Sequence, residues 1–193
     1  ALEKINSLSH KGINKYTTML TDSSYAKQVQ VWTDSTAVNG LPSIEHYIKK
    51  IFLVSDNEAY NRLYEFNGQQ YLNESLWRKG YADTRIARRF VRMSEDENSH
   101  TNGIRFMSNN TLLYEQSPVF SHTGFDFERH YALGNAHIDW KDSLVKAPLD
   151  FTRHNRFTLQ DQQRMLQAVI FPASVPINQR FDLTADDYRM LYQ

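Results

Sequence analysis

The tripeptide Ser55-Asp56-Asn57 brings a hydroxyl, a carboxylate and an amide together in one short stretch. A serine hydroxyl can both donate and accept a hydrogen bond, so it can pass a proton during a group transfer. A simpler interpretation also fits, because Ser55 and Glu58 have the spacing of a capping box and the serine could only start a helix.

Two S-x-x-K patterns offer a possible nucleophile, since a serine one helical turn before a lysine places the amine where it can take the hydroxyl proton. The first runs from Ser24 to Lys27 and the second from Ser143 to Lys146. Residues around Ser24 are polar and lack the apolar helix that would bury such a lysine. Neither pattern is favoured as the nucleophile.

Four helices are predicted from apolar spacing of i, i+3 and i+4. One runs from Ser43 to about Phe52, and a second carries a stripe from Ala59 to Tyr64 and ends near Asn67-Gly68. A third, short helix is expected over residues 73–79, and a fourth begins at the capping box Thr158–Asp161 and continues to Phe171.

The remaining segments show no sustained period. Residues 17–40 are interpreted as a loop with a strand-like fragment at Gln28–Trp32, and residues 91–150 as a long irregular region that could shape a site. Apolar residues from Ala1 to Leu8 predict a helix without a cap, and Thr184–Asp187 predicts the start of another. Both ends therefore indicate a piece of a longer protein.

Two longer stretches carry a family resemblance. Residues 48–63 (IKKIFLVSDNEAYNRL) resemble the helix, S-D-N loop and helix of class A β-lactamases and related penicillin-recognising serine hydrolases, in which S-D-N-x-A-x-N-x-L recurs. Residues 76–86 (LWRKGYADTRI) resemble the family's step into its Ω-loop. The resemblance covers residues 43–90 well, 152–171 in part, and 91–150 poorly.

The resemblance implies a role for each residue of the tripeptide. Ser55 would be catalytic and relay a proton toward the leaving nitrogen, Asn57 would hold the side-chain amide of the substrate, and Asp56 would brace the loop. Glu95 and Glu97 would be the candidates for the deacylating carboxylate of the Ω-loop, although the family spacing E-x-x-L-N is absent. An acidic, solvated turn is the alternative interpretation of both.

Two further family elements are missing. The family places its nucleophile just upstream of a helix like that at Ala1–Leu8, so both S-x-x-K patterns stand in the wrong place, and K-T-G is replaced at best by His122-Thr123-Gly124. The expected fold is therefore mainly α: one partial domain over residues 1–193, the helical domain of the β-lactamase/transpeptidase-like fold, with residues 91–150 as an enlarged Ω-loop-like region and the sheet missing.

The expected function is that of a serine hydrolase or acyl transferase acting through an acyl-enzyme, with the nucleophile upstream of residue 1 and this chain inactive alone. Its substrate would be a β-lactam or a cell-wall peptide, and its location the periplasm or cell envelope, by family analogy. A binding or structural protein that keeps only the helical scaffold is the alternative.

Composition narrows the partners. Lys plus Arg equals Asp plus Glu at 22 each, so no net field favours nucleic acid. Apolar runs are too short for a membrane span, and the chain has no cysteine. No cofactor or metal is expected, because His122, His130 and His137 lack the H-E-x-x-H spacing. The arginines of residues 85–92 and the nearby acids predict a salt-bridged face.

Overall fold

A computed structural model describes residues 1–192. Its first half supplies four α-helices: α1 (Leu2–Ser7), α2 (Ile44–Val54), α3 (Asn57–Asn67) and α4 (Gln69–Arg78). Helix α2 begins at Ser43, whose side chain accepts a hydrogen bond from the His46 N–H at 3.1 Å. Gly68, with φ of 77°, separates α3 from α4. The predicted helices over residues 43–52 and 59–67 are confirmed, and the third starts four residues earlier than expected.

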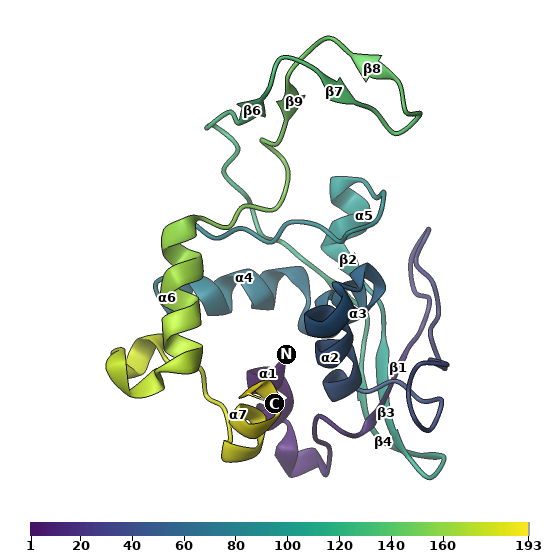
Figure 1. The fold of residues 1–193 in the computed structure, drawn as a ribbon. Coiled ribbons are helices and arrows are strands. Elements are labelled where there is room, and N and C mark those ends of the chain that lie inside the picture. Colours follow the sequence, from purple (N-terminus) through teal and green to yellow (C-terminus); the bar gives the residue numbers. More distant parts are fainter. Residues whose placement is uncertain (193) are drawn as a thin grey trace.

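A three-stranded antiparallel sheet stands behind α2 and α3 (Figure 1). Its strands are β1 (Thr18–Thr21), β3 (Ile104–Ser108) and β4 (Thr111–Gln116), in the order β1-β3-β4. The register pairs Met19 with Phe106 and Phe106 with Tyr114. Met19, Ile104 and Phe106 are fully buried and join the main core cluster with residues of α1, α2 and α3.

The prediction of a mainly α fold with the sheet missing is therefore wrong. Besides the β1-β3-β4 sheet, the structure has three two-stranded sheets. Residues 91–150, interpreted as irregular, contain β3 and β4, whereas the strand-like fragment Gln28–Trp32 makes only an isolated bridge between Thr21 and Val31. The fold combines helices with several small sheets.

A ribbon arm, defined as residues 131–150, projects from the rest of the molecule (Figure 1). Strands β6 (Ala132–Leu133) and β9 (Leu149–Asp150) form its base, and β7 (His137–Ile138) and β8 (Leu144–Val145) lie further out. Before the arm come α5 (Glu95–Ser99), β2 (His100–Thr101) and its partner β5 (Val119–Phe120).

The last part of the chain returns to α1. Helix α6 (Leu159–Ile170) is followed by two 3-10 turns, Pro172–Ser174 and Ile177–Gln179, and by α7 (Ala185–Tyr192); a further 3-10 turn, Ser9–Lys11, follows α1. The predicted capping box at α7 is confirmed, since Thr184 and Asp187 exchange hydrogen bonds of 2.8 and 3.1 Å. Lys15, in the loop after the Ser9–Lys11 turn, pairs with Asp186 and Asp187 of α7. Asn6 of α1 also donates to Asp187, at 2.7 Å, so α7 is held beside α1 (Figure 1).

None of the helices described over residues 1–192 combines the length and the apolar character that crossing a membrane requires.

Candidate active site

Ser55 ends α2 in a left-handed backbone conformation. Its φ and ψ are 53° and 43°, and its N–H donates to the Ile51 carbonyl at 3.0 Å. A non-glycine residue held there costs about 1–3 kcal/mol, and such strained residues cluster at functional sites. The side chain is exposed, and its hydroxyl makes no hydrogen bond to any residue between 1 and 192. Ser55 is not the cap of α3.

Asp56 is the residue that starts α3. Its Oδ1 accepts a hydrogen bond from the Ala59 N–H at 2.8 Å, and its Oδ2 lies 3.2 Å from the Lys50 ammonium. The Ala59 N–H and the Lys50 charge hold the pKa of the Asp56 carboxyl below its ordinary value, against the opposing effect of partial burial. Lys50 also pairs with Asp34 at 2.9 Å. An ionised carboxylate thus braces the turn that carries Ser55 and the exposed Asn57.

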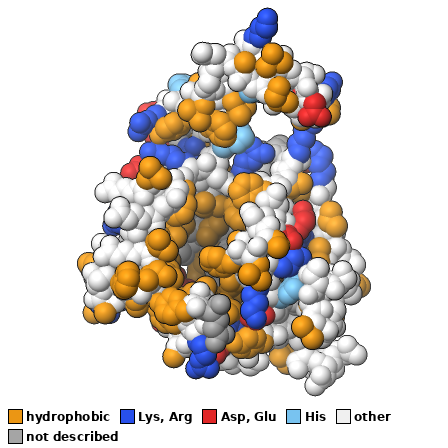
Figure 2. Space-filling view, in the orientation of Figure 1, with side chains coloured by type: hydrophobic (Ala, Val, Ile, Leu, Met, Phe, Trp, Pro, Cys, Tyr) orange, Lys and Arg blue, Asp and Glu red, His pale blue; other side chains and the backbone are white. Residues whose placement is uncertain are grey.

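An apolar cavity of about 410 Å³ is lined by residues on both sides of the S-D-N turn, and not by the three residues of the turn themselves. Phe52, three residues before Ser55, and Tyr60, three residues after Asn57, both line this cavity. Its other walls come from α1, α4, α6 and α7, and Figure 2 shows the hollow lined with hydrophobic side chains. Ala1 is also part of the wall. Cavities of this size and character are typical of ligand or packing sites.

Residues 85–92, which continue from the family-like segment of residues 76–86, lie against the first turns of α3. Asn61 Oδ1 accepts a hydrogen bond from the Phe90 N–H at 2.9 Å, and the rings of Tyr60 and Phe90 are 4.6 Å apart. Asn155 adds a clasp, since its Oδ1 accepts from the N–H groups of Ala87 and Arg88 at 2.8 and 2.9 Å. The loop is therefore fixed close to the S-D-N turn.

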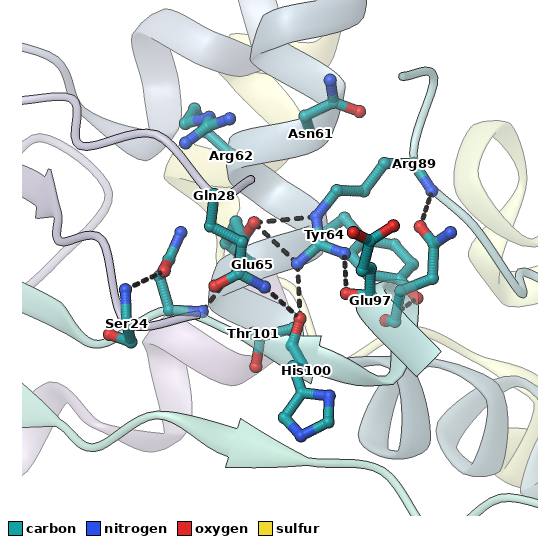
Figure 3. Close-up of polar contacts among 12 residues, drawn as sticks. Ser24, Gln28, Asn61, Arg62, Tyr64, Glu65, Arg89, Glu97, His100 and Thr101 are labelled. Atoms are coloured by element: carbon teal, nitrogen blue, oxygen red, sulfur yellow. Dashed lines mark hydrogen bonds and ion pairs between the residues drawn. The ribbon is translucent and has the colours of Figure 1, made fainter. Parts of the chain in front are cut away.

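A buried ion pair between Arg89 and Glu65 also holds residues 85–92 against α3 (Figure 3). Arg89 and Glu65 are each 1% exposed, and their side chains meet at 2.7 Å. Arg89 also donates to the His100 carbonyl at 2.7 Å, while the second Glu65 oxygen accepts from the Asn102 N–H at 2.7 Å. A charge pair buried in this way is retained only when hydrogen bonds satisfy its remaining atoms, as they do here.

Glu95 and Glu97, the two carboxylates considered for deacylation, form ion pairs with residues outside the S-D-N turn. Glu95 pairs with Arg153 at 2.6 Å. Glu97 forms a capping box with Ser94 and pairs with Lys27 at 2.8 Å, and the Lys27 hydrogen bond is the largest of the effects that lower its pKa. Both belong to α5, whereas the residue placed at Asn61 and Tyr60 is Phe90.

Neither internal S-x-x-K pattern has the helical geometry that the mechanism needs. Ser24 lies in a loop, where its hydroxyl accepts from the Gly103 N–H at 3.1 Å, and Lys27 has φ of 63°. Ser143 and Lys146 flank strand β8, so the serine and lysine are not related by a helical turn. His122-Thr123-Gly124 is not on a strand either.

The histidines of the second half are not gathered around a common point. His137 Nδ1 lies 2.9 Å from the Ala147 carbonyl, and the His122 ring packs on Phe120 at 4.7 Å. Over residues 1–192, no group of three or more His, Asp or Glu side chains has the arrangement of a metal site.

Comparison with protein families shows which family the chain belongs to. A model described as the β-lactamase enzyme family matches residues 6–114, more than half of the chain. The chain belongs to this family. The β-lactamase-like resemblance found in the sequence is thereby confirmed. The matched region contains the S-D-N turn, the loop of residues 85–92, strands β1 and β3 and the first part of β4. The ribbon arm and α6 lie outside the matched region. Comparisons with the curated proteins and with the solved structures gave no match.

Several residues of the site went unassigned by sequence reasoning. Asn61 belongs to the S-D-N-x-A-x-N pattern, which could have marked it as a site residue. Its partner Phe90 could not be predicted from the spacing of residues in the sequence. Asn155 lies 65 residues beyond Phe90 and stands in no motif. The Glu65–Arg89 pair likewise joins two segments that only the fold brings together.

Proposed function

We propose that this chain is the S-D-N part of a serine hydrolase or acyl transferase that works through an acyl-enzyme, with the nucleophilic serine in residues that precede Ala1. The observation that carries the proposal is the state of Ser55, an exposed hydroxyl without a hydrogen-bond partner in residues 1–192, held in a strained turn beside the cavity. Ala1 is among the residues that line that cavity, so a residue joined to it would start from the cavity wall.

Each residue of the turn has a chemical task in this proposal. When the nucleophile has attacked an amide-like carbonyl and the C–N bond breaks, the Ser55 hydroxyl gives its proton to the leaving nitrogen and takes another from the attacking side. The Asn57 amide binds the side-chain amide of the substrate. Asp56 does not exchange protons, because its ionised carboxylate caps α3 and pairs with Lys50.

The engagement of Glu95 and Glu97 supports a long-lived acyl-enzyme. Both carboxylates are held in ion pairs at α5, and the apolar side chain of Phe90 lies beside Tyr60 instead. Neither glutamate is therefore proposed as the base for deacylation. Small acyl substrates such as β-lactams or cell-wall peptides, and a periplasmic or envelope location, are proposed by family analogy.

The test is the intact mass of the full-length protein after incubation with a penicillin. The proposal predicts a stoichiometric adduct on the full-length protein and none on the 193-residue chain. Ser55→Ala should slow its formation about 100-fold, in the range of general acid–base contributions, whereas Ser35→Ala, at an exposed serine in the loop before α2, should leave it unchanged. A full-length protein that never forms the adduct would favour a non-catalytic scaffold.

A further inference from the structure

Four arginines occur within residues 85–92, but they are used in different ways. Arg85 is buried and donates to the carbonyls of Asp126, Thr152 and His154. Arg89 is neutralised by Glu65. Arg88 and Arg92 form no ion pair with any carboxylate in residues 1–192. The sequence-based expectation of a salt-bridged face therefore fails at these two guanidinium groups.

Both unpaired arginines belong to the loop, and they contact the ribbon arm or the residues that follow it. The Arg92 guanidinium lies 4.5 Å from the centre of the Trp140 ring, beyond β7 in the arm. Arg88 Nη1 is 3.4 Å from His154 Nε2, just after the arm returns. Figure 2 shows Lys and Arg side chains collected between the arm and the apolar hollow. The loop and the arm thus form the two sides of a basic slot.

The slot adjoins the candidate active site through short contacts. The Arg88 carbonyl accepts hydrogen bonds from the Tyr60 hydroxyl at 3.3 Å and from Asn155 Nδ2 at 2.9 Å. Tyr60 also lines the cavity beside the S-D-N turn. A substrate whose reacting carbonyl lies at that turn would extend its acyl portion past Phe90 into the slot.

The acids around the slot do not cancel its charge. Glu95 is taken by Arg153, and Asp83 by Arg156. Asp150 lies near His154 and accepts hydrogen bonds from its own neighbour Thr152. Partial burial, and then the Arg88 charge, lower the pKa of the His154 imidazole.

We propose that Arg88 and Arg92 bind carboxylate groups on the acyl portion of the substrate, so that this enzyme prefers anionic acyl donors. The inference rests on the proposed function and names its substrate class. A guanidinium offers a planar pair of N–H donors that matches a carboxylate, and it is only weakly hydrated. Aromatic side chains on either side, Phe90 and Trp140, would cover the apolar part of the acyl group.

The experiment compares benzylpenicillin with α-carboxybenzylpenicillin, which differ by one carboxylate on the acyl side chain. In the full-length protein, acylation by the carboxylated compound should be about tenfold faster, as expected for one charge-assisted hydrogen bond of about 1.4 kcal/mol. Arg88→Gln with Arg92→Gln should abolish the preference while benzylpenicillin still reacts. Arg189→Gln removes an exposed charge on α7 and should preserve it.

The outcomes separate this inference from the proposed function. Equal rates for the two penicillins, or a preference that survives the double substitution, would overturn the carboxylate site and leave the acyl-enzyme intact. If neither compound reacts, the proposed function fails. The carboxylate site is then tested separately, by comparing the binding of phenylmalonate with that of phenylacetate through the NMR signal of the Trp140 indole N–H. Selective binding of phenylmalonate that Arg88→Gln removes supports the site; equal or absent binding of both overturns it.

Discussion

The side-chain oxygen of Asn61 accepts a hydrogen bond from the Phe90 N–H at 2.9 Å. Asn61 lies one helical turn from Asn57, and Phe90 lies in the loop of residues 85–92, at the start of the Ω-loop-like region. One contact therefore relates the S-D-N turn to the loop, and it places an aromatic side chain, not a carboxylate, at the point where they meet.

Replacing Asn61 tests this relationship. Asn61 is 1% exposed, and Asn61→Ala removes the partner of the part-buried Phe90 N–H, so it should lower the free energy of unfolding by about 1 kcal/mol. Hydrogen exchange at the Phe90 amide should accelerate at the same time. Asn135→Ala, at an exposed position of the ribbon arm, is the control. Unchanged protection of the Phe90 amide would show that the contact does not hold the loop.

Ser55 should be strained in a way that glycine relieves. Glycine adopts positive φ without steric cost, so Ser55→Gly should be about 1 kcal/mol more stable than Ser55→Ala, in which the strain remains. Thermal unfolding of the two variants measures the difference. Ser35→Gly and Ser35→Ala form the control pair. If the two Ser55 variants melt together, the left-handed turn carries no strain.

Lys4 should make stability depend on pH. Burial lowers the pKa of its amine to about 8, while its ammonium donates to the carbonyls of Phe66 and Asn67. Between that value and the ordinary 10.5, the unfolded chain binds more protons, so the free energy of unfolding should rise with pH. Denaturation with urea at pH 8.0 and about 9.5 measures the slope on the 193-residue chain.

Lys4→Met should flatten that slope, and Lys11→Met, at an exposed lysine after α1, should not. The range stops below pH 10 because burial also raises the pKa of Tyr60 to about 12. Above the pKa that this phenol has in the unfolded chain, its ionisation there lowers the free energy of unfolding. A slope that is equal in the wild type and Lys4→Met would assign the pH dependence to another group.

Removing only one partner of the Glu65–Arg89 pair should strongly lower the free energy of unfolding. Arg89→Met leaves Glu65 buried without its cation, and should reduce the free energy of unfolding by about 3–5 kcal/mol. Adding Glu65→Leu should recover part of the loss, because the uncompensated charge is then gone. Urea unfolding of the single and double variants measures both. A double variant that is less stable than Arg89→Met would show that the hydrogen bonds to Asn102 and His100 dominate.

Helices were predictable here because their signals are local. The stripes before and after Ser55, and the capping boxes at Thr158 and Thr184, depend on residues within one or two turns. Even so, the spacing could not decide which residue caps α3. The spacing of Ser55 and Glu58 indicated a cap that does not form. Ser55 ends α2 in a left-handed conformation, and Asp56 caps α3 instead.

The sheet could not be predicted for the opposite reason. Strand β1 has only four residues, and its partner β3 lies more than 80 residues further along the chain. Thr18–Thr21 does not alternate clearly between polar and apolar residues, because Thr21 is buried with Met19. The cause of burial is α2 and α3 packing on the sheet, which is a tertiary effect. The hydrogen bonds from the Ala87 and Arg88 N–H groups to Asn155 could not be predicted either, because they too depend on tertiary structure.

The central claim is that Ser55 assists a serine nucleophile carried by residues before Ala1. Peptide mapping of the penicillin-treated full-length protein tests it most directly, by locating the added mass on one residue. The account predicts that the acyl group is on a serine upstream of Ala1, and that Ser55→Ala slows its attachment without moving it. An acyl group on Ser24, Ser55 or Ser143 would contradict the account.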